Sequence, residues 1–370
     1  MNALEELALL LRPAGAGLYL VSSGRAEQEE LVRRLYAASS LEEARRRFRE
    51  RLGRLASARA VLLGVPSDVG AGYLRGANLG PQAIRTRLLD EDPDWPARAD
   101  RAGVVDLGDV PCVPQLLHDE MLSAAQLDAS RRALYPDLAP AEAARLPTSP
   151  LSIAERALSL ALSVNPRAAP VVLGGDHSCA WPAVRALAAA RPGLGIVQVD
   201  AHTDLLQERL GVRYCFGTWA YHANDLLGRG GRLVQVGIRA SRHDRAHWEG
   251  TLGVRQFWAA EVRADPARAL DAILAHVKAS GASSVYFSND VDGTDEAFAD
   301  ATGTPEPDGL SPGLVVELVR RLGREVGLAG GDLCEVAPPI ARTPGGGERT
   351  LAVAGRYLRE TLAAILGAPV

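Results

Sequence analysis

Short apolar runs recur along the chain and end in glycine, proline or acidic residues, as the buried strands of a parallel sheet do. These runs cover residues 61–65, 103–107, 170–173, 194–199, 232–238, 284–288 and 331–336. Between most of them, apolar residues repeat at helical intervals, over residues 151–164, 181–190, 267–279, 314–322 and 349–366. Alternating strands and helices predict a three-layer α/β/α fold with a mostly parallel sheet of about eight strands.

Two segments depart from this alternation. Residues 1–58 are densely charged, with leucines at loose helical spacing, and we expect a helical N-terminal extension there. Residues 59–370 then form one catalytic domain. Within it, residues 108–150 contain six prolines around helical pieces, which indicates an insertion over the edge of the sheet.

Composition and charge exclude several classes of protein. Hydrophobic residues make up 47% and charged residues 23%, the balance of an ordinary globular protein. The formal net charge of −4 argues against a nucleic-acid binder. Lys278 is the only lysine, so the chain has no P-loop lysine and one candidate for Schiff-base chemistry.

The cysteines and the start of the chain bear on its compartment. There is no CxxC motif and no spacing typical of a secreted disulfide framework, so a reducing compartment is expected. No apolar run is long enough to span a membrane, and acidic residues stand where a signal peptide would be basic. We therefore expect a cytoplasmic protein without a membrane partner. The cysteines are Cys112, Cys179, Cys215 and Cys334.

Three of the predicted strands end in groups of aspartate and histidine. The carboxyl ends of parallel strands converge on one crevice, so these side chains can meet although they are far apart in the sequence. Alone, an Asp-His pair after glycines is often a helix cap, and Asp-x-Asp-Gly is often a turn. Together, the groups predict a metal site. The six donors are His177, Asp200, His202, Asp204, Asp290 and Asp292.

This donor set is too large for one ion. Four aspartates forced together repel one another and raise one another's pKa values unless divalent cations neutralise them. Two ions that share carboxylates account for the number of donors. Oxygen and imidazole ligands without a thiolate favour Mn²⁺, with Ni²⁺, Fe²⁺, Co²⁺ and Zn²⁺ as alternatives.

From about Val61 onward the chain resembles the ureohydrolases, which include arginases, agmatinases, guanidinobutyrases, formimidoylglutamases and guanidine hydrolases. The long N-terminal extension is more similar to the guanidine hydrolase branch than to classical arginases. The motifs that carry the resemblance begin with Gly64-Val-Pro-Ser-Asp-Val-Gly70, Gly80-Pro-Gln-Ala-Ile-Arg85 and Gly174-Gly-Asp-His-Ser178. They continue with Asp200-Ala-His-Thr-Asp204, Asp290-Val-Asp-Gly293, Ala301-Thr-Gly-Thr304 and Gly331-Asp-Leu-Cys-Glu335-Val-Ala-Pro338.

The resemblance implies an arginase-like fold and a role for each motif. His177, Asp200, Asp204 and Asp290 would bind one metal ion. Asp200, His202, Asp290 and Asp292 would bind the other, so that Asp200 and Asp290 bridge. A hydroxide between the ions would attack the guanidinium carbon.

Two carboxylates would take part in the reaction itself, according to the same resemblance. Asp204 would accept the hydroxide proton and pass it to the departing nitrogen. Glu335 would pair with the guanidinium by charge-assisted hydrogen bonds. Glu335, Thr304, Phe216 and Trp219 are the residues expected to contact substrate.

The chain also departs from the arginase pattern. Phe216 stands where arginases and many agmatinases have a histidine that acts on the substrate. The acidic residues that hold the α-amino group of arginine after a Gly-x-Arg strand end are absent, which disfavours L-arginine. Phe216 and Trp219 suit a smaller pocket. The segment that replaces those acids reads Ala240-Ser241-Arg242.

Other interpretations of neighbouring residues stay open. His222 could supply the missing imidazole or be an ordinary packed histidine. Cys215 could be a nucleophile, but an inert buried thiol fits better because no activating partner is evident. The local group of aromatic residues at positions 216–221 could serve packing alone.

These observations predict a dinuclear-metal hydrolase that cleaves a C–N bond of guanidine or a short alkylguanidine, giving urea plus ammonia or an amine. Agmatine or 4-guanidinobutyrate is the alternative substrate. A ureohydrolase-like subunit that binds a partner without catalysis is a second possibility, although all six metal ligands are intact. A dinuclear phosphoesterase would need arginine clamps near the metal ions and an Asn/His-rich ligand set, and neither is found beside the three motifs. The expected cofactor is two Mn²⁺ or Ni²⁺ ions, and the expected assembly is a homotrimer or homohexamer.

Overall fold

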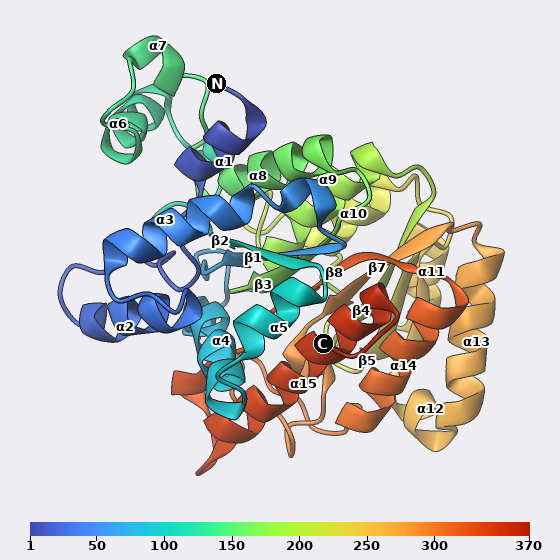
Figure 1. Ribbon diagram of the computed structural model, residues 1–370. Coiled ribbons are helices and arrows are strands. Elements are labelled where there is room, and N and C mark those ends of the chain that lie inside the picture. The colour runs from blue at the N-terminus through green and yellow to red at the C-terminus, as the bar shows by residue number, and fades with distance from the viewer.

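The computed structural model describes all 370 residues, which form one eight-stranded sheet with helices on both faces (Figure 1). Every pair of neighbouring strands is parallel, in the order β2-β1-β3-β8-β7-β4-β5-β6. The strands are β1 (Ala60–Val65), β2 (Val104–Asp109), β3 (Ala169–Gly174), β4 (Leu194–Val199), β5 (Leu233–Ile238), β6 (Arg255–Trp258), β7 (Ser284–Asn289) and β8 (Leu328–Leu333).

Fifteen α-helices and six short 3-10 helices connect and cover the strands. The helices of the first half are α1 (Ala3–Leu10), α2 (Arg25–Leu35), α3 (Leu41–Leu52), α4 (Gly80–Glu91), α5 (Trp95–Arg101), α6 (Ala124–Leu134), α7 (Pro140–Ala143) and α8 (Pro150–Val164). Those of the second half are α9 (Ala180–Ala190), α10 (Trp219–Leu226), α11 (Arg245–Leu252), α12 (Ala259–Ala264), α13 (Pro266–Ala279), α14 (Pro312–Glu325) and α15 (Gly346–Leu366). The 3-10 helices are η1 (Leu55–Ser57), η2 (Ala77–Leu79), η3 (Asp119–Met121), η4 (His177–Cys179), η5 (Val291–Gly293) and η6 (Pro338–Ile340).

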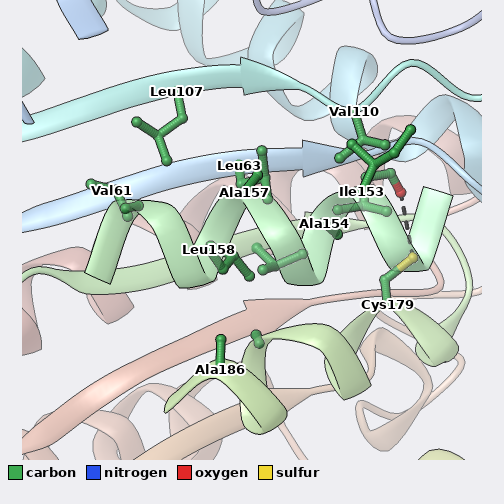
Figure 2. Close-up of a cluster of buried hydrophobic side chains, with 14 of the residues drawn as sticks. Val61, Leu63, Leu107, Val110, Ile153, Ala154, Ala157, Leu158, Cys179 and Ala186 are labelled. Atoms are coloured by element: carbon green, nitrogen blue, oxygen red, sulfur yellow. Dashed lines mark hydrogen bonds between the residues drawn. The ribbon is translucent and has the colours of Figure 1, made fainter. Parts of the chain in front are cut away.

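The sheet separates two hydrophobic cores, and alternate residues of β1 enter each of them. Val61 and Leu63 point into the core under α8, whereas Leu62 joins the opposite core with α4, α14 and α15. Figure 2 shows the first core where α8 crosses β1 and β2, with Ala157 and Leu158 among the labelled side chains. Because both faces are buried, the strands read as continuous apolar runs.

The predicted fold is confirmed, with three differences in detail. All strand pairs are parallel, not merely most of them. The last strand begins earlier than expected, at Leu328, and ends at Leu333. Strand β6 was not predicted, because it has only four residues and begins with the polar pair Arg255-Gln256, so no apolar run marks it.

The first 58 residues contain three helices, α1 to α3. Buried leucines of α1 belong to the same core as α8, and Glu6 of α1 accepts two hydrogen bonds from Arg156 of α8 at 2.6 and 2.9 Å. Residues 108–150 carry α6 and α7, which lie beside α1 at the periphery (Figure 1). The domain boundary at residue 58 and the insertion stay predictions about how the chain is divided. None of the helices combines the length and apolarity that a bilayer span requires.

The strand order decides which loops meet. Strand β8 lies between β3 and β7, and β4 pairs with β7 on its other side. The loops that leave the carboxyl ends of these four neighbouring strands therefore lie side by side, which is where a parallel α/β sheet binds ligands.

Candidate functional site

His177 lies in η4, directly after β3, and three aspartates surround one nitrogen of its ring. This nitrogen, Nδ1, is 3.2 Å from Asp200 Oδ2 and 3.1 Å from both Asp204 Oδ2 and Asp290 Oδ2. It is buried and makes no hydrogen bond. Three carboxylate oxygens converging on an unpartnered imidazole nitrogen is the arrangement of ligands around a cation.

The other nitrogen of the His177 ring fixes its tautomer. Nε2 lies 2.9 Å from Ser288 Oγ, and that hydroxyl donates to Asp332 Oδ1 at 3.1 Å. Since the serine proton goes to the carboxylate, the serine oxygen accepts the Nε2 proton. In the neutral imidazole, Nδ1 is then left with a lone pair, as a metal ligand needs.

His202 forms the second half of the cluster. Its Nδ1 lies 3.0 Å from Asp292 Oδ2 and 3.6 Å from Asp200 Oδ1. Asp200 therefore turns one oxygen toward each histidine, as a bridging carboxylate does. The second half is more open, because 27% of the His202 side chain is exposed, compared with 1% of His177. The structure thus brings together all six residues that the sequence predicted as ligands, in two overlapping groups.

The cluster is strongly charged for a buried site. Burial, together with repulsion from Asp200, raises the pKa of Asp204 to about 6. Burial and the neighbouring carboxylates raise the pKa of Asp290 well above its ordinary value. Burial alone would lower the pKa of His202. The attraction of Asp292 and Asp200 outweighs burial and raises this pKa to about 12. Two imidazoles do not balance four aspartates, so the donor set fits two divalent ions.

A chain of three buried glutamine side chains supports Asp200 from inside the sheet. Gln198 on β4 donates to Asp200 Oδ2 at 2.7 Å. Gln235 on β5 donates to Gln198 Oε1, and Gln256 on β6 donates to Gln235 Oε1, both at 2.8 Å. All three residues are fully buried, and the register pairs them across the strands. The sequence analysis missed this chain, although a glutamine inside an otherwise apolar strand is a visible signal.

Glu335 follows β8 and lies beside the ligand cluster. Its Oε1 accepts the His177 backbone N–H at 2.9 Å, whereas its Oε2 makes no hydrogen bond within the chain. Burial and the charges of Asp290 and Asp176 raise its pKa well above the ordinary value. Glu335 and Asp204 both have left-handed backbone, with φ of 62° and 51°, a strain that is typical of functional positions.

Two of the residues predicted to contact substrate instead contact ligand residues. Trp219 is 1% exposed, and its indole N–H donates to Asp204 Oδ2 at 2.9 Å. The Thr304 hydroxyl donates to Asp292 Oδ2 at 3.1 Å. Substrate contact by these two residues stays a prediction, and their hydrogen bonds favour a role in holding the two aspartates.

Phe216 is half-buried and lines a cavity of about 580 Å³ next to the cluster. The other two candidates of this segment serve packing. His222 Nε2 lies 3.0 Å from the Arg213 carbonyl oxygen, and its ring packs against Tyr214. Cys215 is buried, and burial raises the pKa of its thiol, as expected for an unreactive cysteine.

Comparison with known proteins finds related sequences over most of the chain. The model of the arginase family matches residues 58–364. A guanidinobutyrase of Pseudomonas aeruginosa is 31% identical, and the match covers 77% of this chain and 80% of that protein. The N(1)-aminopropylagmatine ureohydrolase of Thermus thermophilus is 33% identical, with 76% and 83% covered.

Solved structures give the same result for the fold. Proclavaminate amidino hydrolase from Streptomyces clavuligerus superposes with a TM-score of 0.62 at 29% identity, covering 84% of this chain and 92% of that one. Agmatine ureohydrolase of Thermoplasma volcanium superposes with a TM-score of 0.60 at 27% identity, with 84% and 90% covered.

Proposed function

The chain belongs to the arginase family of hydrolases that act on guanidino compounds, and from this premise we propose that it cleaves a C–N bond of a small guanidino compound. The products are urea and either ammonia or an amine. The observation that carries the proposal is the convergence of six aspartate and histidine side chains beside Glu335, a carboxylate with one free oxygen.

We assign the ligands to two divalent ions, either Mn²⁺ or Ni²⁺. His177, Asp200, Asp204 and Asp290 hold one ion, and Asp200, His202, Asp290 and Asp292 hold the other. When bound, the ions neutralise the aspartates and supply the Lewis acidity that activates water near neutral pH. The unpartnered Nδ1 of His177 and the excess of buried carboxylates support this assignment.

Asp204 is the residue we assign to proton transfer. Its Oδ2 is held by the Trp219 indole, and its Oδ1 makes no hydrogen bond within the chain. A carboxylate with one oxygen fixed and the other without a partner is suited to take a proton from water and return it to the departing nitrogen. No histidine stands at position 216 to share this transfer, so Asp204 acts without that second group.

Glu335 is the residue we assign to the guanidinium. Its Oε1 is fixed by a backbone N–H, so Oε2 is presented in one orientation to the planar N–H groups of the substrate. Such charge-assisted hydrogen bonds position the guanidinium carbon for attack.

For the substrate we favour guanidine or a short alkylguanidine, with agmatine or 4-guanidinobutyrate as alternatives. L-arginine fits poorly, because Ala240 and Ser241 offer no charge to its ammonium and Arg242 repels it. An ammonium or carboxylate that is desolvated without a partner costs several kcal/mol. We also propose a homotrimer or homohexamer, which the mass in solution would test.

The decisive experiment is urea release from a panel of guanidino compounds by protein loaded with Mn²⁺ or Ni²⁺. The panel contains guanidine, methylguanidine, agmatine, 4-guanidinobutyrate and L-arginine. We expect two metal ions per chain and turnover of at least one small guanidino compound at a kcat/KM above that for L-arginine. Urea from none of them, with both ions bound, would favour a partner-binding subunit instead.

A further inference from the structure

The cavity next to Phe216 is lined mostly by hydrophobic residues, together with Gln115, Gln126 and one charged residue. Its walls come from the loops that follow β1, β2 and β4, in residues 69–73, 115–126 and 209–216. Arg209 is the only charged residue among those that line it. A volume of about 580 Å³ is within the range of small-molecule sites and exceeds what a bare guanidinium needs.

The loop after β1 connects this cavity to the candidate active site. The carbonyl oxygen of Gly70, in the cavity wall, accepts the Phe216 backbone N–H at 3.1 Å. Further along the same loop, Leu74 approaches Gly303: a Cβ built on Gly303 would lie 3.5 Å from the Leu74 oxygen and 3.9 Å from Glu335 Oε2. The same loop therefore forms part of the cavity wall at residues 69–73 and, at Leu74, lies near Gly303 and Glu335.

Arg209 is exposed and forms no ion pair with an acidic residue of the chain. Its guanidinium carbon lies 5.0 Å from the centre of the Phe216 ring, and its side chain makes no ion pair and no hydrogen bond. The neighbouring Arg213, which lies outside the cavity lining, is paired with Glu120 at 3.4 Å. An unpaired guanidinium on an aromatic face is a ready partner for a carboxylate.

We propose that this cavity receives the tail of the substrate and that Arg209 selects a tail ending in a carboxylate over one ending in an ammonium. The inference rests on the proposed function, because it places the guanidinium of the same substrate at Glu335. A carboxylate tail gains a charge-assisted pair with Arg209. An ammonium tail meets a like charge and finds no acidic residue in the cavity lining, so it is desolvated without a partner.

This selection separates the two alternative substrates that carry a charged tail. 4-Guanidinobutyrate and agmatine have similar length and differ in the sign of the terminal charge. Guanidine and short alkylguanidines have no charged tail, so Arg209 does not discriminate against them. We therefore expect 4-guanidinobutyrate, and not agmatine, to be the better of the two tailed compounds.

The test compares kcat/KM for 4-guanidinobutyrate and agmatine in wild type, Arg209→Gln and Arg209→Glu. We expect wild type to prefer the carboxylate compound by about 10-fold or more, mainly through KM. Arg209→Gln should bring the two values close together, and Arg209→Glu should reverse the preference. Arg268→Glu is the matched control, since Arg268 is exposed on α13 without an ion pair and lies outside the cavity lining. It should leave the wild-type preference unchanged.

Measuring binding as well as urea release distinguishes a failure of this inference from a failure of the proposed function. The same two compounds are titrated by calorimetry into metal-loaded protein, so that selection is measured as a ratio of dissociation constants even where turnover is absent. Equal dissociation constants in wild type, or a preference that Arg209→Glu does not change, would overturn the role of Arg209 and leave the hydrolase assignment intact. Selective binding without urea from any compound of the panel would support Arg209 and overturn the hydrolase.

Discussion

Two groups of buried carboxylates lie in the same sheet, and they differ in what neutralises them. At one edge, Arg85 of α4 holds Asp109 Oδ1 at 2.5 Å and Asp106 Oδ1 at 3.0 Å, and both the guanidinium and Asp109 are buried. In the candidate metal centre, by contrast, four aspartates face two imidazoles. In the first group, one permanently charged guanidinium contacts both carboxylates, whereas in the second, three carboxylates converge on an imidazole nitrogen that makes no hydrogen bond.

This difference distinguishes a buried aspartate with a structural role from one that belongs to a candidate metal site. Asp109 also accepts backbone N–H bonds from Gly15 and Gly17, so this group fastens the N-terminal segment to β2. Its carboxylates are satisfied by hydrogen bonds from the chain alone, and it is structural. A group of carboxylates whose charge the chain leaves unbalanced needs an ion from outside.

The largest effect is expected when Arg85, the cation that pairs with Asp106 and Asp109, is replaced. Arg85→Leu leaves Asp106 and Asp109 without their counter-charge, and we expect the free energy of unfolding to fall by about 3–5 kcal/mol. Urea denaturation measures this, with metal content as the second readout. Arg87→Leu is the control, because Arg87 forms a surface pair with Glu91 and should cost less than about 1 kcal/mol. Equal losses in the two variants would contradict the comparison.

Asp290→Asn removes a charge from the unbalanced group. We expect loss of bound metal and a fall in kcat/KM of more than about 100-fold, since the asparagine is a weaker bridging ligand. In the metal-free state, the same change relieves repulsion from Asp292 and Asp200, so its melting temperature should exceed that of metal-free wild type. A metal-free variant less stable than wild type would show that the group is not overcharged.

Glu335→Gln tests the carboxylate beside the ions without touching a ligand. Metal content should stay at the wild-type value, while kcat/KM falls by about 10- to 150-fold, the equivalent of 1.5–3 kcal/mol for one charge-assisted bond. Glu317→Gln on α14, a position whose side chain is 44% exposed, serves as the control. Full activity in Glu335→Gln would remove this residue from the site.

Removal of the metal by a chelator should make stability depend on pH. The pKa of Asp204 is about 6 in the folded metal-free protein, against an ordinary value of 3.8, so the folded state keeps a proton that the unfolded chain has released. Stability therefore falls as pH rises from about 4 through about 6, by about 1–2 kcal/mol. The raised pKa of His202 acts in the same direction above its ordinary value of 6.5. Melting temperatures at pH 5 and pH 7, with chelator and with Mn²⁺, check this, and greater metal-free stability at pH 7 would contradict it.

The smallest expected effect concerns the glutamine chain that reaches Asp200. Gln256→Leu breaks the chain at its far end, two strands away from the ligand, and we expect the dissociation constant for Mn²⁺ to rise by up to about 10-fold. Calorimetry of the metal alone measures this. Gln82→Leu on α4, which is not part of the chain, should leave the constant unchanged.

The ligand set was predictable because parallel strands bring their carboxyl ends to one edge whatever the order of the strands. His177, Asp200 and Asp290 each follow an apolar run directly, so their meeting required only the fold class. The resemblance to the ureohydrolases added the role of Glu335, which spacing alone does not give.

Other features could not be derived, because they depend on register and on side-chain rotamers. Gln256 joins the glutamine chain because β6 pairs with β5 in one particular register. The four residues of β6 contain no pattern from which that strand could be predicted. Trp219 was expected at the substrate, yet its indole N–H turns to Asp204. The pairing of Arg85 with Asp106 and Asp109 joins residues about 20 positions apart, and no local pattern distinguishes them from surface charges.

The position of β8 has a consequence for the order in which the protein assembles. This strand is the last in the sequence, yet it lies in the middle of the sheet and is the only link between β3 and β7. His177 stands on one side of that seam, and Asp200 and Asp290 stand on the other. Before residues 328–335 are in place, a growing chain therefore has five of the six donors on one side of this seam and only His177 on the other. Insertion of β8 is therefore needed to bring His177 to the other donors, and because Glu335 follows β8, the complete site forms only when this last strand is in place.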